Sequence, residues 1–89
     1  MEIKVVETAD TTLILKDCTQ FNYEVNPTEI TLALPQGWTS EDLTIITFNT
    51  GDTAPQITIP STLKVKGAVE PNKAVEISIY NNTLIMLNI

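Results

Sequence analysis

The chain lacks histidine and arginine and has one cysteine among its 89 residues. Without histidine, a nucleophile would need a lysine or a carboxylate as its base, and no recognisable motif joins such groups to Cys18, Ser40, Ser61 or Ser78. Zinc sites built from cysteine and histidine clusters are excluded, and no EF-hand-type loop collects the acidic residues for Ca²⁺. The single cysteine excludes an intrachain disulfide. We therefore expect no enzyme, no metal site and no cofactor.

Positive charge is also scarce, because five lysines face eleven acidic residues and the net charge is −6. Nucleic-acid binding needs clustered lysine and arginine against the phosphates, and these lysines are scattered. The same shortage disfavours an anionic membrane surface. The apolar runs are far shorter than the ~20 residues of a membrane helix, and the first residues do not form a secretion signal. We expect a soluble chain made in a cytoplasm, with no nucleic-acid or membrane partner.

What the chain does contain is strand-forming sequence, with fourteen threonines and many other β-branched residues. Short segments of alternating apolar and polar residues recur every 8–12 residues or so, without a helical period or an internal repeat. Before the C-terminal segment, the expected strands are residues 3–6, 11–16, 21–25, 29–34, 43–48, 56–59 and 63–66. The pattern predicts a single all-β domain over residues 1–89, a small antiparallel β-sandwich or barrel of about eight short strands.

The C-terminal segment, residues 74–89, predicts a β-hairpin whose two-residue loop is Asn81-Asn82, because asparagine tolerates the left-handed backbone that such a loop requires. In this register Ile79 lies opposite Leu84, and one apolar face points to the core. The other face of the last strand is apolar as well, and it carries Ile85, Leu87 and Ile89. We expect these three side chains at a homo-oligomer interface, and burial by a second sheet of the same chain is the alternative.

Three aromatic residues are candidates for stacking on a sugar ring, namely Trp38, Tyr23 and Tyr80. Trp38 follows a Pro-Gln-Gly turn, where a side chain can be exposed. A tryptophan that closes one end of the core is the competing interpretation.

Three segments, taken together, resemble a domain found at the ends of bacteriophage tail and head fibres. Residues 21–35 join a Phe-Asn-Tyr strand to a Thr/Leu-rich strand that ends in proline, as in that family. Residues 46–55 are similar to its Thr-Phe-x-Ser/Thr-Gly signature, and residues 59–82 to its Leu-Pro-x-x-Val-Lys-Trp motif and the Tyr-Glu-Ile-Ser-Ile segment that follows. Val65 stands where the family usually has tryptophan. The resemblance covers about residues 20–87.

The resemblance implies a virion structural protein, a fibre or head-decoration domain without catalytic activity. It implies localisation in the virion, contact with other virion proteins, and self-association, with a trimer favoured because fibres of this family have threefold symmetry. The alternative function is a receptor-binding module that recognises a glycan on the host surface.

Overall fold

The computed structural model describes residues 3–15, 20–35 and 43–89, and within these ranges the regular structure consists of nine strands and no helix. The strands are β1 (Ile3–Val6), β2 (Asp10–Ile14), β3 (Gln20–Tyr23), β4 (Glu29–Ala33), β5 (Thr44–Asn49), β6 (Gln56–Thr58), β7 (Lys64–Lys66), β8 (Ala74–Tyr80) and β9 (Thr83–Asn88). The prediction of a mostly-β chain is confirmed. Cys18 and Trp38 lie outside the described residues.

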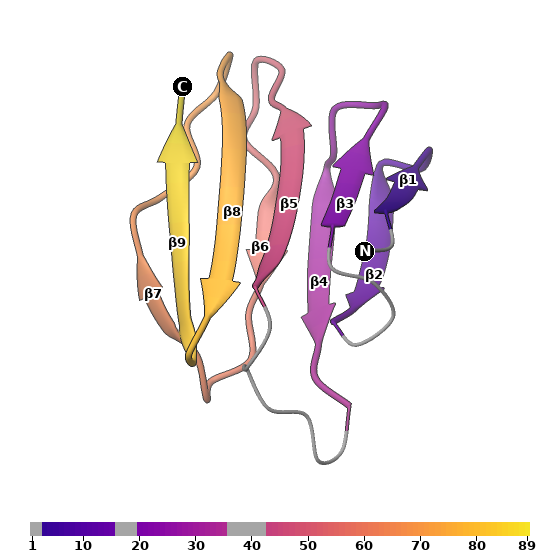
Figure 1. Ribbon diagram of the computed structural model, residues 1–89. Helices are drawn as coiled ribbons and strands as arrows, with labels where there is room; N and C mark the ends of the chain where they lie inside the picture. The colour runs from indigo at the N-terminus through magenta and orange to yellow at the C-terminus, as the bar shows by residue number, and fades with distance from the viewer. Residues whose placement is uncertain (1–2, 16–19, 36–42) are drawn as a thin grey trace.

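The strands form two open sheets, one of six strands in the order β1-β3-β5-β8-β9-β7 and one of three strands in the order β2-β4-β6 (Figure 1). As far as β6 the chain alternates between the sheets, so β1, β3 and β5 are parallel neighbours in one, and β2, β4 and β6 in the other. The predicted antiparallel architecture is therefore wrong, because the six-stranded sheet is mixed and the three-stranded sheet is parallel. After each of these strands the chain crosses to the other sheet before it returns. Such a crossover connects parallel neighbours, whereas a hairpin connects antiparallel ones.

Three successive passes through both sheets stack in register. In the three-stranded sheet, Thr12, Thr31 and Thr58 occupy equivalent positions on adjacent strands. Leu13 pairs with Leu32 one residue further along, and both are buried. Because side chains alternate between the faces of a strand, the threonines form the outer row while the leucines point towards the other sheet.

A single hydrophobic cluster lies between the two sheets and draws on both of them. Its members are Val6, Leu13, Leu15, Phe21, Tyr23, Ile30, Leu32, Ile46, Phe48, Leu63, Val75, Ile77, Ile79 and Leu84. Partly buried residues, including Ile57 and Met86, pack around it. This cluster covers the inner face of the six-stranded sheet and leaves the outer face uncovered by the smaller sheet.

The C-terminal hairpin has the predicted register. Ile79 pairs with Leu84, Glu76 pairs with Leu87, and the loop residues Asn81 and Asn82 have φ values of 51° and 60°. Positive φ at both loop positions is the geometry of a type I′ turn, whose twist matches that of the flanking strands. The turn therefore fixes which face of β9 points outward.

The connection between β7 and β8 is held by two polar side chains. The Thr50 hydroxyl donates to the Glu70 carbonyl at 2.7 Å and accepts from the Lys73 amide at 2.8 Å. The Asn88 side chain accepts from the Glu70 amide at 3.0 Å and donates to the Ala68 carbonyl at 2.7 Å. Together these bonds tie the end of β9 and the end of β5 to the same loop, which fixes the hairpin against β5.

Candidate interaction surface

The outer face of β9, together with the residue that follows it, carries an apolar row that we call the β9 stripe, consisting of Ile85, Leu87 and Ile89. Their side chains are 39%, 51% and 80% exposed, whereas Leu84, which points to the opposite face, is fully buried. The contrast follows from the hairpin register, because moving one residue along a strand changes the face. The described residues of the second sheet therefore do not bury these side chains.

Charged residues of opposite sign flank the β9 stripe. On the β8 side, Glu76 lies directly beside Leu87. On the β7 side, Lys66 lies beside Ile85 and Lys64 beside Thr83. Paired residues point to the same face, so these three charges surround the stripe on the outer surface.

The middle of the same face carries a hydrogen-bonded polar group. The Asn22 side-chain oxygen accepts from Thr47 Oγ1 at 2.8 Å and from Gln20 Nε2 at 3.0 Å. Thr47 is in turn the neighbour of Glu76 in the β5–β8 pair. The outer face is therefore apolar along β9 and polar along β3 and β5.

Tyr23, one of the three residues predicted to stack on a sugar, is buried, so its ring is not exposed on the surface. Its ring packs edge-on against Phe48, with the ring centroids 5.9 Å apart and the planes at 74°. Its hydroxyl lies 2.6 Å from that of Thr11, within hydrogen-bonding distance. Burial raises the pKa of the Tyr23 phenol above its ordinary value, and the hydrogen bond to Thr11 partly opposes this shift. The alternating strand pattern at Phe21 and Tyr23 explains why both rings face inward.

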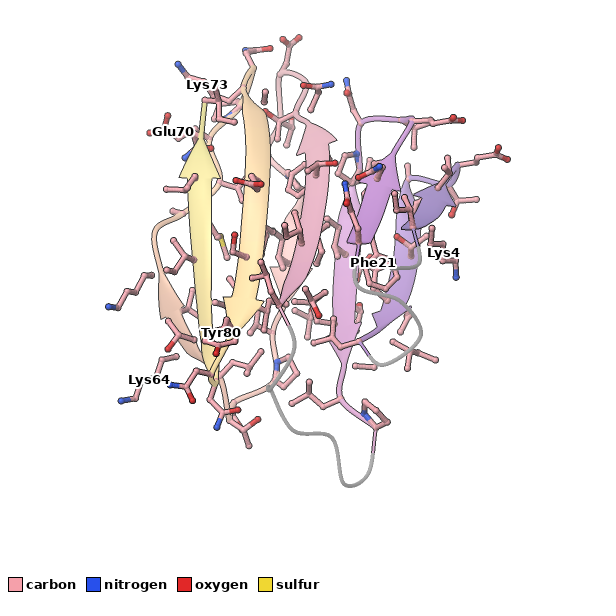
Figure 2. All side chains as sticks on the ribbon, in the orientation of Figure 1. Lys4, Phe21, Lys64, Glu70, Lys73 and Tyr80 are labelled. Carbon is pink, nitrogen blue, oxygen red and sulfur yellow. The ribbon has the colours of Figure 1, made fainter. Side chains whose placement is uncertain are left out.

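Tyr80 is exposed at the end of β8 and is available for stacking. It pairs with Thr83, whose neighbour on the far side is Lys64, and Figure 2 shows Tyr80 and Lys64 at the same end of the hairpin. Trp38, the third stacking candidate, lies outside the described residues. The structure therefore does not bring the three predicted aromatic residues together into one platform.

A shallow hollow of about 250 Å³ opens at the opposite end of β8 and β9. Tyr23, Phe48, Asn49, Ala74, Glu76 and Ile89 contribute to its lining. Among the described residues, no group of three histidine, cysteine, aspartate or glutamate side chains could hold a metal ion. In the described part of the chain, no helix is long and apolar enough to cross a membrane.

Sequence reasoning identified the β9 stripe but missed its charged flank on β7. The position of Glu76 beside Leu87 follows from the hairpin register. The pairing of β7 with β9, in contrast, joins two strands that β8 separates in the sequence. No local signal in residues 64–66 specifies that pairing. The polar group at Asn22 depends likewise on the parallel pairing of β3 with β5.

No protein-family model, no curated protein and no solved structure matches this chain.

Proposed function

We propose that this protein is a structural component of a bacteriophage particle, a fibre or head-decoration domain that works by self-association. In this proposal the two sheets form an open β-sandwich, and the β9 stripe is the surface on which copies meet. The observation that carries the proposal is that the exposed side chains of Ile85, Leu87 and Ile89 follow one another on the outer face of the hairpin, between charged residues of opposite sign. The sequence resemblance to phage fibre domains supports the virion as its location.

The energetic motive is burial of the β9 stripe. Complete burial of an aliphatic side chain is worth about 1.5–3 kcal/mol, and these residues are partly covered already, so each contributes less than that. A contiguous apolar row rimmed by charged residues is a common form of protein–protein contact surface. Association through this row would remove it from water while leaving the acidic remainder of the surface hydrated.

Mass spectrometry of purified phage particles tests the location. The particles are prepared from an induced lysogen that carries the gene, and a strain with the gene deleted is the control. Peptides of this chain in the particle band, at a copy number comparable with other structural proteins, would support the proposal. Their absence from particles that are otherwise complete would contradict it.

The second candidate function is glycan binding at the same face. Tyr80 offers an exposed ring, and the fixed amide of Asn22 belongs to a group of hydrogen-bonding side chains in the middle of the sheet. Aromatic stacking combined with preoriented polar groups is how proteins hold sugar rings. A glycan array followed by titration of Tyr80→Ala and Asn22→Ala variants tests it, and saturable binding that both substitutions weaken is the expected result for a receptor-binding module.

A further inference from the structure

The charges beside the β9 stripe are arranged as negative on one side and positive on the other. Glu76 lies on β8, and Lys64 and Lys66 lie on β7, with β9 between them. Within the described residues, the side chains of these three residues form no ion pair or hydrogen bond. Neighbouring strands are about 4.8 Å apart and successive outward residues about 6.7 Å, so the three charges fall within the footprint of one contact.

Such an arrangement is self-complementary under one kind of two-fold symmetry. When two copies of a sheet meet face to face, a two-fold axis lying along β9 places the β8 side of one copy over the β7 side of the other. Glu76 of each copy then lies over the β7 side of its partner, one outward residue (about 6.7 Å) along the strand from Lys66 and two from Lys64, while the two stripes meet at the axis. An axis in the interface and perpendicular to β9 would instead place β8 over β8 and β7 over β7, so Glu76 would not meet the lysines.

We propose, on the basis of the proposed self-association, that the partner of this face is a second copy of the chain in a two-fold face-to-face dimer, with Glu76 of one copy paired to Lys66 of the other and Lys64 further along the same strand. A two-fold interface uses the same patch on both copies, and this patch holds an apolar row together with both signs of charge. The threefold symmetry implied by the family resemblance requires two different patches in contact, one from each neighbour.

The net charge of −6 strengthens the choice of a second copy docked in this orientation. Two acidic chains repel one another at long range, so a patch where opposite charges meet favours close association in that orientation. Lys64 and Lys66 are two of only five basic residues in the sequence, and both stand at this patch. In the proposed dimer, the charge pairing fixes how the two copies are oriented, and burial of the β9 stripe stabilises the contact between them.

A charge-reversal experiment tests the orientation. We expect sedimentation equilibrium to give twice the chain mass of 9.8 kDa for the unaltered protein. Glu76→Lys should raise the dimer dissociation constant at least about tenfold, and so should the double variant Lys64→Glu/Lys66→Glu. Combining all three changes exchanges the two signs and should restore the constant to within about threefold of the unaltered value. Glu29→Lys, on the exposed face of the three-stranded sheet, is the matched control and should leave the constant unchanged.

Each other outcome overturns the inference in a distinguishable way. A trimer would contradict two-fold symmetry while leaving self-association in place. A dimer insensitive to both reversals, or a triple variant as weak as the separate ones, would show that Glu76 does not face the lysines. A monomer at high micromolar concentration would contradict the proposed self-association as well. Far-UV circular dichroism on every variant excludes loss of folding as the cause.

Discussion

The hydroxyls of Tyr23 and Thr11 lie 2.6 Å apart, and they join β3 of the six-stranded sheet to β2 of the three-stranded sheet. The two side chains are twelve residues apart in the sequence, and they belong to successive strands on opposite sides of the core. The contact is a polar link between the two sheets within a largely apolar interior. It also explains why a tyrosine, with a polar tip, is accommodated at a buried position.

Removing either hydroxyl should destabilise the fold unequally. Thr11→Val leaves the buried Tyr23 hydroxyl without this partner and should lower the free energy of unfolding by about 1–3 kcal/mol. Tyr23→Phe leaves only the half-buried Thr11 hydroxyl unpaired and should lower it by about 0.5–1.5 kcal/mol. Urea denaturation of both variants and of the double variant measures the coupling. Additive effects in the double variant would contradict a direct bond.

The raised pKa of Tyr23 predicts a loss of stability at alkaline pH. The unfolded chain releases the phenol proton at about the ordinary value of 10, whereas the native chain keeps it to higher pH. Stability contributed by the neutral phenol is therefore complete below that pH and falls as the pH rises from about 10 through the raised value. Urea denaturation between pH 8 and about 11 should show this fall, and Tyr23→Phe should remove that part of it. An identical slope in the variant would contradict the assignment.

Truncation of Leu84 and of Leu87 should change the free energy of unfolding by very different amounts, because the two side chains lie on different faces of β9. Leu84→Ala removes a fully buried side chain and should lower the free energy of unfolding by about 2–5 kcal/mol. Leu87→Ala should change the concentration-independent part of that free energy by less than about 0.5 kcal/mol. Chemical denaturation at several protein concentrations separates the two effects. A large intrinsic loss for Leu87→Ala would place that side chain in the core.

Thr50→Val tests the anchoring of the connection between β7 and β8. The substitution keeps the side-chain shape of the buried Thr50 but removes its bonds to the Glu70 carbonyl and the Lys73 amide. We expect a loss of about 1–3 kcal/mol in the free energy of unfolding, together with faster amide exchange in residues 70–73. Thr53→Val, at an exposed position nearby, is the control and should change stability by less than about 0.5 kcal/mol. Equal effects at the two positions would contradict the anchoring role.

Local chemistry in the sequence determined how well each part of the fold could be predicted. The hairpin was predicted residue by residue, because the two loop asparagines fix the register and the register fixes the faces. The mostly-β composition was predicted from alternation and β-branching. The parallel stacking of β1, β3 and β5 was not, because each pairing joins strands separated by a full pass through the other sheet. Tyr23 illustrates the limit at a single residue, since its strand pattern predicted an inward ring while its chemistry suggested a sugar platform.

The lysines beside the β9 stripe could not be predicted from the sequence, because their position also depends on a pairing between strands that are not consecutive. Val65 pairs with Leu84 in a parallel arrangement that brings the flanking lysines beside β9. A three-residue strand that begins and ends with lysine is typical of an exposed sheet edge, and β7 does lie at the edge of the six-stranded sheet. Its place beside the β9 stripe, on one side of the proposed contact surface, appears only when the neighbouring strand is known.

The most direct test of the account is the mass of the folded chain in solution, compared with that of Leu87→Glu. Sedimentation equilibrium from low to high micromolar concentration should show the unaltered chain above its monomer mass of 9.8 kDa, rising with concentration. Leu87→Glu should remain folded by circular dichroism and stay at the monomer mass, while Thr58→Glu, on the outer face of the other sheet, should associate like the unaltered chain. An unaltered chain that stays monomeric at high micromolar concentration, or a Leu87→Glu variant that associates equally well, would contradict the claim that copies meet through the β9 stripe.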